Sequence, residues 1–313
     1  MLELTSSART GLVGNLAFIS FTFGEVIITL FAYLTRHWQK LKWANTAFIG
    51  LGIPYLYFMP ESPLYIYARG HFDQLEDLLR RIARENHRKE SDWYLSYVEL
   101  IQQQPKKLIP MTFREKFYQL FARPTTIVKL IIALLIGFTT LMLYVKISYG
   151  LAVLNMSPYL WILIGAIVEA ASYVTSSLLI STRLGRKGSF LLMMSLTIVC
   201  TILIPITTKY NSFTMMLIAQ FGKYTISGAT AISWIYVPEL FPTSIRSTAN
   251  GLFIAFSRFG AILAPIINTS ISKAYLPHTF YLSSILASLV LISSLILPET
   301  KGKPMDDVNV TDI

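Results

Sequence analysis

Eight long apolar runs constrain the fold of this chain more than any other feature of its sequence. The hydrocarbon core of a bilayer is about 30 Å thick, and a helix of roughly 20 apolar residues crosses it with its backbone polar groups paired. The runs cover residues 12–34, 43–59, 126–145, 158–181, 189–208, 213–237, 248–271 and 278–297. They predict an all-α polytopic membrane protein with eight transmembrane helices. The short run at 43–59, which contains Pro54, fits a span least well.

The composition argues against several other classes of protein. Hydrophobic residues make up 53% of the chain and charged residues 14%, whereas about a quarter of a soluble domain is charged. The single cysteine, Cys200, cannot form a disulfide framework, and the four histidines lack metal-ligand spacing. We therefore expect no enzyme activity, no metal and no cofactor. We assign the net charge of +10 to the connecting segments rather than to nucleic-acid binding.

The distribution of lysine and arginine predicts an orientation, because these residues gather in cytoplasmic connections. With the amino terminus inside, 18 of them fall in inner connections and 6 in outer ones. Eleven of the 18 lie in the segment 60–125, and without that segment the count is 7 to 6. We therefore expect both termini in the cytoplasm, an expectation that depends largely on this one segment.

The segment 60–125 has the character of a soluble loop with amphipathic helices. The stretch FDQLEDLLRRIARENHRK spaces apolar residues on one helical face. They are Phe72, Leu75, Leu78, Leu79 and Ile82. The stretch MTFREKFYQLFARP predicts a second, interfacial helix that leads into the third span.

Four charged residues, Glu25, Glu169, Lys223 and Arg258, lie near the centres of predicted spans. A charge at that depth costs roughly 2.5–3.5 kcal/mol even on the mild insertion scale, so four of them predict a polar interior. One interpretation is a water-filled cavity that several helices line. The alternative is that the four pair as Glu–Lys and Glu–Arg and only hold the bundle together.

Several motifs resemble one known family of membrane proteins. They are PESPLYIYARG (60–70), STRLGRKGS (181–189), GKYTISGATAISWIYVPELFPTSIRSTANG (222–251) and LPETKGKP (297–304). Together they are similar to the organic cation, organic anion and carnitine transporters, a branch of the major facilitator superfamily. The resemblance implies a partial major facilitator fold, in which the eight spans correspond to helices five to twelve and helices one to four are missing. It also implies a place in the plasma membrane.

The resemblance also implies a domain organisation. The last two helices of the amino-terminal half cover 1–59, the central cytoplasmic loop covers 60–125, the carboxy-terminal six-helix half covers 126–298, and a cytoplasmic tail covers 299–313.

The sequence departs from the family pattern at three positions. The family usually has arginine where Leu64 stands, an acidic residue at Thr182, and an apolar residue at Glu25. The sugar transporters, a related branch, carry Gln-Gln in helix seven and Gly-Pro-x-Pro-Trp in helix ten, and the corresponding stretches here contain neither.

The resemblance places a carboxylate-binding arginine of the anion and carnitine branches at Arg258, and their lysine at Lys223. A guanidinium at low dielectric binds a carboxylate through two hydrogen bonds. Glu169 would then meet the cationic end of a zwitterion, and the deep aromatic residues Tyr144 and Tyr224 would contact the ligand or pack in the core. The expected substrate, moved by alternating access, is a small organic anion or a zwitterion such as carnitine.

A second group of charges lies at the predicted cytoplasmic ends of the helices. It comprises Glu239, Arg246, Arg183, Arg186 and Glu299. In the superfamily such charges form ion pairs that close the inner side, although exposed charges at helix ends are often only solvated. The partners expected for the chain are the substrate and the lipid bilayer, with no nucleic acid and with the coupling ion left open. The alternatives are a truncated membrane protein that does not transport, or transport of an organic cation or a sugar.

Overall fold

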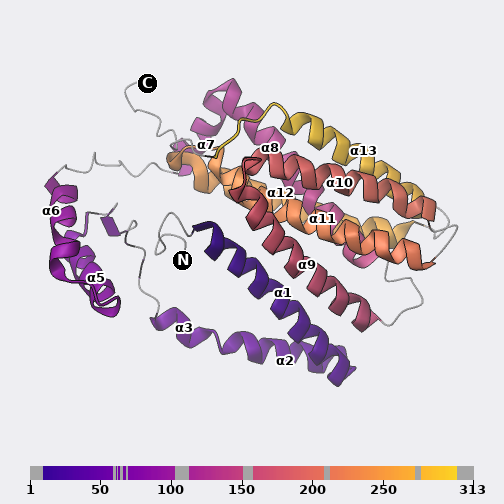
Figure 1. The fold of residues 1–313 in the computed structure, drawn as a ribbon, viewed down its shortest axis with the longest axis horizontal. Helices are drawn as coiled ribbons and strands as arrows, with labels where there is room; N and C mark the ends of the chain where they lie inside the picture. Colours follow the sequence, from indigo (N-terminus) through magenta and orange to yellow (C-terminus); the bar gives the residue numbers. More distant parts are fainter. Residues whose placement is uncertain are drawn as a thin grey trace. The chain divides into compact units, whose positions relative to one another are not determined.

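The computed structural model describes residues 10–58, 61, 63, 66–67, 70–102, 113–150, 158–207, 212–271 and 276–301. In this part of the chain all regular structure is helical (Figure 1), which confirms the all-α prediction. The helices are α1 (Thr10–Thr35), α2 (Trp38–Gly50), α3 (Ile53–Phe58), α5 (Phe72–Glu85), α6 (Tyr94–Gln102), α7 (Phe113–Ala122), α8 (Pro124–Gly150), α9 (Pro158–Ser181), α10 (Gly185–Thr207), α11 (Ser212–Glu239), α12 (Thr243–Ser270) and α13 (Leu276–Ser294), with a 3₁₀ turn at Glu90–Asp92.

The chain divides into two compact units, residues 1–14 with 35–112, and residues 15–34 with 113–313. Of the expected cytoplasmic tail, residues 302–313 lie outside the described residues, as do residues 103–112 of the expected loop.

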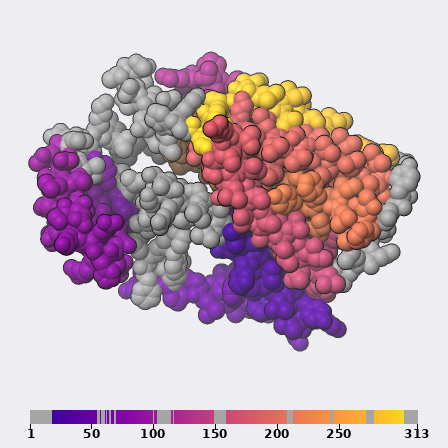
Figure 2. Space-filling view, viewed as in Figure 1, coloured from indigo at the N-terminus to yellow at the C-terminus, as the bar shows by residue number. Residues whose placement is uncertain are grey.

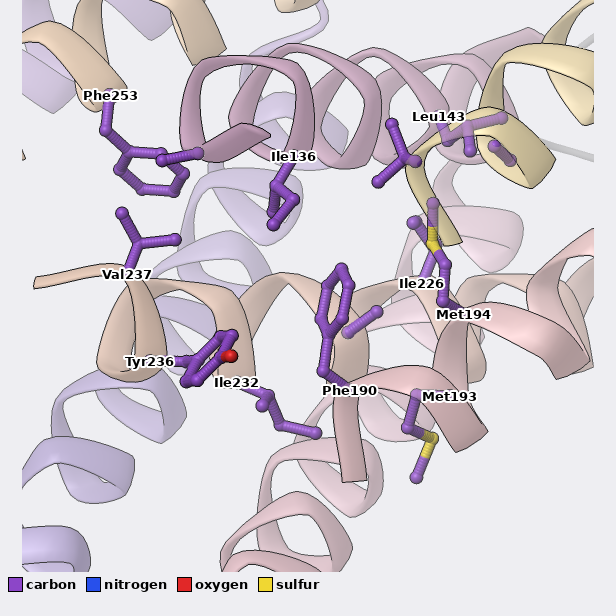
Figure 3. Close-up of a cluster of buried hydrophobic side chains, with 14 of the residues drawn as sticks. Ile136, Leu143, Phe190, Met193, Met194, Ile226, Ile232, Tyr236, Val237 and Phe253 are labelled. Atoms are coloured by element: carbon purple, nitrogen blue, oxygen red, sulfur yellow. The ribbon is translucent and has the colours of Figure 1, made fainter. Parts of the chain in front are cut away.

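The larger unit is a helical bundle around α11. This helix packs against α8, α9, α10 and α12, while α8 pairs with α12 and α10 with α13. Figure 3 shows the apolar core that these contacts enclose. The labelled side chains come from α8 (Ile136, Leu143), α10 (Phe190, Met193, Met194), α11 (Ile226, Ile232, Tyr236, Val237) and α12 (Phe253). The bundle therefore has a continuous core with α11 at its centre.

Helices α8 and α12 approach one another closely at small residues. A methyl group on Gly260 would collide with the carbonyl oxygen of Phe138, and one on Gly137 would collide with the side chains of Ser257 and Phe253. Small residues at such crossings are typical of helix pairs in membranes, where dispersion contacts replace the hydrophobic effect. This crossing fixes which face of α12 is turned toward the bundle.

The outer surface of the bundle is apolar. Along α13, Leu282, Ile285 and Ile292 are each at least 65% exposed, and Figure 2 shows α13 in yellow beside α10 on one face of the bundle. A soluble monomer rarely exposes apolar patches of this kind. Lipid is the solvent that such a surface requires.

Five of the eight expected spans are confirmed as helices long and apolar enough to cross a bilayer. They lie at Phe18–Thr35, Pro124–Ser148, Tyr159–Ser181, Gly185–Thr207 and Ile245–Ser270. Helix α11 is long enough to cross a bilayer, with 28 residues, but it is not among the five apolar spans. It lies at the centre of the bundle and contains many small and hydroxylated residues. The apolar part of α13 at His278–Ser294 is shorter than a full span.

The expected span at 43–59 is not one helix. The structure breaks it at the turn Leu51–Gly52 into α2, with 13 residues, and α3, with 6. Pro54 then lies in the first turn of α3, the position where a helix tolerates the missing N–H of proline. Neither piece alone is long enough to cross a bilayer.

The smaller unit contains the amphipathic helix that the sequence predicts, as α5. Leu75 and Leu78 pack with Ile66 and Tyr97 in a small core, and the Tyr97 hydroxyl donates a hydrogen bond to the carbonyl of Phe72 at 2.9 Å. The second predicted helix is α7, which belongs to the larger unit and packs on α8 and α12.

Candidate functional site

Three of the four intramembrane charges meet inside the larger unit. The Lys223 ammonium on α11 lies 3.2 Å from a carboxylate oxygen of Glu169 on α9 and 3.6 Å from one of Glu25 on α1. Lys223 is 3% exposed, and Glu169 is completely buried. Aromatic contacts of Phe18 with Tyr173 and of Tyr33 with Tyr159 hold α1 along α9 (Figure 1). We call Glu25, Glu169 and Lys223, with their tyrosine partners, the charge cluster.

Glu169 is saturated with hydrogen-bond donors. The hydroxyl of Tyr144 donates to both of its oxygens, at 2.9 and 3.1 Å, and the hydroxyl of Tyr173 donates to one of them at 2.6 Å. With the ammonium of Lys223, three side chains fix this carboxylate. The binding residues expected from the sequence include Tyr144 but not Tyr173. Tyr173 lies four residues after Glu169 and so shares its helical face.

Glu25 is held more loosely. Its ion pair with Lys223 is the longer of the two, and its second carboxylate oxygen is buried without a hydrogen-bond partner among the described residues. Two carboxylates thus share one ammonium. With all three groups ionised, the charge cluster carries a net charge of −1.

Arg258 lies near the middle of α12 and is exposed. Its neighbours Ser257 and Gly260 turn toward α8, so the guanidinium leaves α12 on another face. In the described part of the chain it has no ion pair. The structure therefore places both carboxylates with Lys223 and neither with Arg258.

Tyr224 packs against the apolar core, which is one of the two roles expected for it. Its hydroxyl donates to Thr175 at 2.7 Å, and its carbonyl accepts a hydrogen bond from Ser172 at 2.5 Å, so it joins α11 to α9. Its ring stacks on Phe221. None of these contacts reaches the charge cluster.

Buried polar groups extend the polar face of α11 on both sides of Lys223. Gln220 precedes it by one turn and Ser227 follows it by one turn, which puts all three on one helical face. Neither the amide of Gln220 nor the hydroxyl of Ser227 has a hydrogen-bond partner among the described side chains. Such groups normally bond to water or a ligand when they are buried. The spacing of Gln220, Lys223 and Ser227 is visible in the sequence. That Gln220 and Ser227 have no hydrogen-bond partner among the described residues is visible only in the structure.

The second predicted group of charges assembles where α9, α10 and α11 meet the segment after α13. Arg186 pairs with Glu239 at 2.6 Å, and the hydroxyl of Thr300 donates to Glu239 at 2.9 Å. Arg246 donates its Nε–H to the carbonyl of Phe241 and interacts electrostatically with Glu239. We call this arrangement the charged end. Arg183 is exposed and takes no part in it among the described contacts.

Glu299 binds the beginning of α10, although it lies 113 residues after Arg186 and 112 after Lys187 in the sequence. Its carboxylate accepts the backbone N–H groups of Arg186 and Lys187, and those of Thr300 and Lys301, all at 3.0 Å. Carboxylates at a helix start satisfy free amides and oppose the positive end of the helix dipole. Partial burial acts to raise the pKa of Glu299, but these four amide bonds outweigh it and hold the pKa below its usual value of 4.5.

Glu299→Gln is expected to lower the free energy of unfolding by about 1 kcal/mol at neutral pH. The pKa of Glu299 is lower in the folded chain, so its contribution is present above pH 4.5 and is lost as the pH falls through the folded pKa. The melting temperatures of the wild type and the variant should therefore converge in acid. Glu99→Gln, at an exposed carboxylate of α6, is the control. A difference that persists unchanged below the folded pKa would contradict this account.

The sequence comparisons agree with the membrane character of the bundle. The family described as sugar (and other) transporter matches residues 2–311. The chain is 30% identical over 315 residues to solute carrier family 22 member 12 of Mus musculus, covering 98% of this chain and 55% of that protein. It is 32% identical to solute carrier family 22 member 13 of Homo sapiens, with coverages of 93% and 51%, and 27% identical to organic cation/carnitine transporter 2 of Homo sapiens, with coverages of 92% and 51%. The chain spans about half the length of the relatives it matches.

Proposed function

Because this chain belongs to the sugar (and other) transporter family, we propose that it moves small organic ions across a membrane by alternating access. The resemblance to the organic cation, organic anion and carnitine transporters is confirmed by the relatives. The chain is a multi-pass membrane protein and, like these relatives, not an enzyme. The proposed substrate carries a carboxylate, as an organic anion or a zwitterion such as carnitine.

The main support for this proposal is that Arg258 lies near the middle of α12 without an ion pair among the described residues. An arginine in the middle of a membrane helix is costly, and such residues normally pair with an acid or line a polar cavity. The acids that would neutralise it are taken by Lys223. A substrate carboxylate supplies the missing partner, with two charge-assisted hydrogen bonds to the guanidinium.

The charge cluster favours a zwitterion over a simple anion. Its net charge of −1 attracts a cationic group, and the aromatic rings of Tyr144 and Tyr173 lie beside Glu169. In such a ligand the cationic group would lie beside Glu169, and the carboxylate would lie with Arg258 and Lys223. The same net charge is the one observation that favours an organic cation, which is therefore the second candidate.

Competition binding to the purified chain separates these candidates. Radiolabelled carnitine is bound to the protein, and unlabelled carnitine, benzoate, tetraethylammonium and glucose are tested as competitors. The proposal predicts that carnitine competes best and that benzoate competes better than glucose. Displacement of carnitine by tetraethylammonium but not by benzoate would favour an organic cation as the substrate, and displacement by glucose but not by benzoate would favour a sugar.

We assign the charged end a gating role and place it, with both termini, on the cytoplasmic side of the plasma membrane. The pair Arg186–Glu239 joins the start of α10 to the end of α11, and the Lys301 ammonium donates to the carbonyls of Ser181 and Thr182 at the end of α9. These contacts tie three helices to the segment after α13. Breaking them would release that side of the bundle and change the populations of the two access states.

Arg246→Glu is expected to change the turnover rate several-fold while it leaves the affinity for substrate within about twofold, because it alters the balance of states and not the site. The measurement is the concentration dependence of carnitine uptake, which separates maximal rate from half-saturation. Arg183→Glu makes the same charge change at an exposed residue outside the charged end. A change in affinity without a change in maximal rate would argue against gating.

A further inference from the structure

The two carboxylates of the charge cluster differ in how firmly their charge is held. Glu169 accepts hydrogen bonds from Tyr144 and Tyr173 and lies 3.2 Å from the ammonium of Lys223. Glu25 has the longer contact with the same ammonium and one buried oxygen without a donor among the described residues. Each oxygen of Glu169 thus has a hydrogen-bond donor. Glu25 is the group whose ionised form the structure supports least.

The surroundings of Glu25 hold one positive charge for two negative ones. The charged or titratable groups that face it are Lys223 from α11, Glu169 and Tyr173 from α9, and Tyr144 from α8. A buried charge without full compensation is costly, and one of two neighbouring carboxylates then takes a proton. A proton on Glu25 brings the net charge of the cluster from −1 to zero.

The same ion pair limits access to Lys223. While Glu25 is ionised, the ammonium is shared between two carboxylates, and a third carboxylate from a substrate would add a further uncompensated charge. Once Glu25 is protonated, its attraction for the ammonium falls and Lys223 has capacity for another acid. Proton binding at Glu25 and carboxylate binding beside Lys223 therefore favour one another, and linkage makes that effect reciprocal.

From this geometry we propose that Glu25 is a proton-binding site that couples entry of a proton to entry of the substrate carboxylate. This inference rests on the proposed function. A proton from the water on one side forms the O–H bond of the Glu25 carboxylic acid as the substrate binds. It leaves to the water on the other side when the substrate is released and Glu25 pairs again with Lys223. The chain then acts as a proton symporter.

Proton binding can be tested without transport. Infrared difference spectra of the purified 313-residue chain report the carbonyl band of a carboxylic acid as carnitine is added at constant pH, and a pH indicator reports the protons taken up. We expect about one proton per bound carnitine. Glu25→Gln has the shape of the protonated acid, so both signals, expressed per carnitine bound, should disappear in this variant. Glu99→Gln, at an exposed carboxylate, is the matched control and should retain both. A melting curve confirms that each variant is folded.

Transport gives the second readout. In proteoliposomes, carnitine uptake below saturation should rise up to about tenfold per unit decrease in external pH, the limit for a single linked proton. Uptake by Glu25→Gln should not depend on pH. If uptake by the wild type is independent of pH, or if Glu25→Gln leaves the infrared band and the proton count unchanged, the inference is wrong and the proposed function stands. If the proton signals depend on Glu25 but no carnitine is taken up at any pH, the proton site stands and the proposed function fails.

Discussion

Replacing Lys223 with methionine is expected to lower the free energy of unfolding by about 3–5 kcal/mol, the usual cost of removing one partner of a buried ion pair. The methionine side chain is unbranched, uncharged and one atom shorter, and it leaves two buried carboxylates without a cation. Tyr144 and Tyr173 still donate to Glu169. Glu25 has only the ion pair among the described contacts, so it suffers the larger loss.

The lone cysteine makes this measurement direct. Cys200 is 3% exposed in the folded chain, so a thiol-reactive fluorescent dye labels it only on unfolding. Lys40→Met, at an exposed lysine of α2, controls for the general effect of removing a lysine. The double variant Lys223→Met/Glu25→Gln should recover part of the loss, because it removes one uncompensated charge. If Lys223→Met melts at the same temperature as Lys40→Met, the charge cluster does not stabilise the bundle.

Replacing Arg258 with alanine is expected to weaken carnitine binding by about 10- to 100-fold, since a hydrogen-bonded pair with a charged group contributes about 1.5–3 kcal/mol. Arg258→Lys keeps the charge but loses the bidentate geometry, so it should give an intermediate affinity. Arg183→Ala removes an exposed arginine outside the proposed site and should bind like the wild type. Melting temperatures should stay close to that of the wild type, because Arg258 has no ion pair among the described residues. Unchanged carnitine affinity in Arg258→Ala would remove this residue from the binding site.

The sequence predicts the elements of this fold well, because a bilayer makes hydropathy a strong signal for helices. The break in the span at 43–59 also has a local signal, since Gly50, Gly52 and Pro54 surround the turn where α2 ends. The apolar run alone predicts one continuous span, and these residues predict the break. Helix α11 shows the opposite case: an apolar run at 213–237 predicts a span, but the 28-residue helix there is not among the five helices apolar enough to cross a bilayer.

The site is harder to predict, because periodicity gives the face of a helix but not its neighbour. The sequence predicts Glu25, Glu169 and Lys223 near the centres of spans. Only the positions of α1 and α11 beside α9 show that the two glutamates share one lysine. Tyr173 is visible as an i, i+4 partner of Glu169. In contrast, the bond from Glu299 to the start of α10 spans more than a hundred residues, and no local pattern predicts it.

The most direct test of carnitine transport is time-dependent uptake of radiolabelled carnitine into proteoliposomes that contain the purified 313-residue chain. Liposomes without protein and liposomes with the Arg258→Ala variant are measured in parallel. We expect saturable uptake by the wild type above the protein-free background, and a loss of about 10- to 100-fold below saturation in the variant. A folded wild-type chain that inserts into the liposomes and takes up no carnitine would contradict it, and would favour a membrane protein that does not transport.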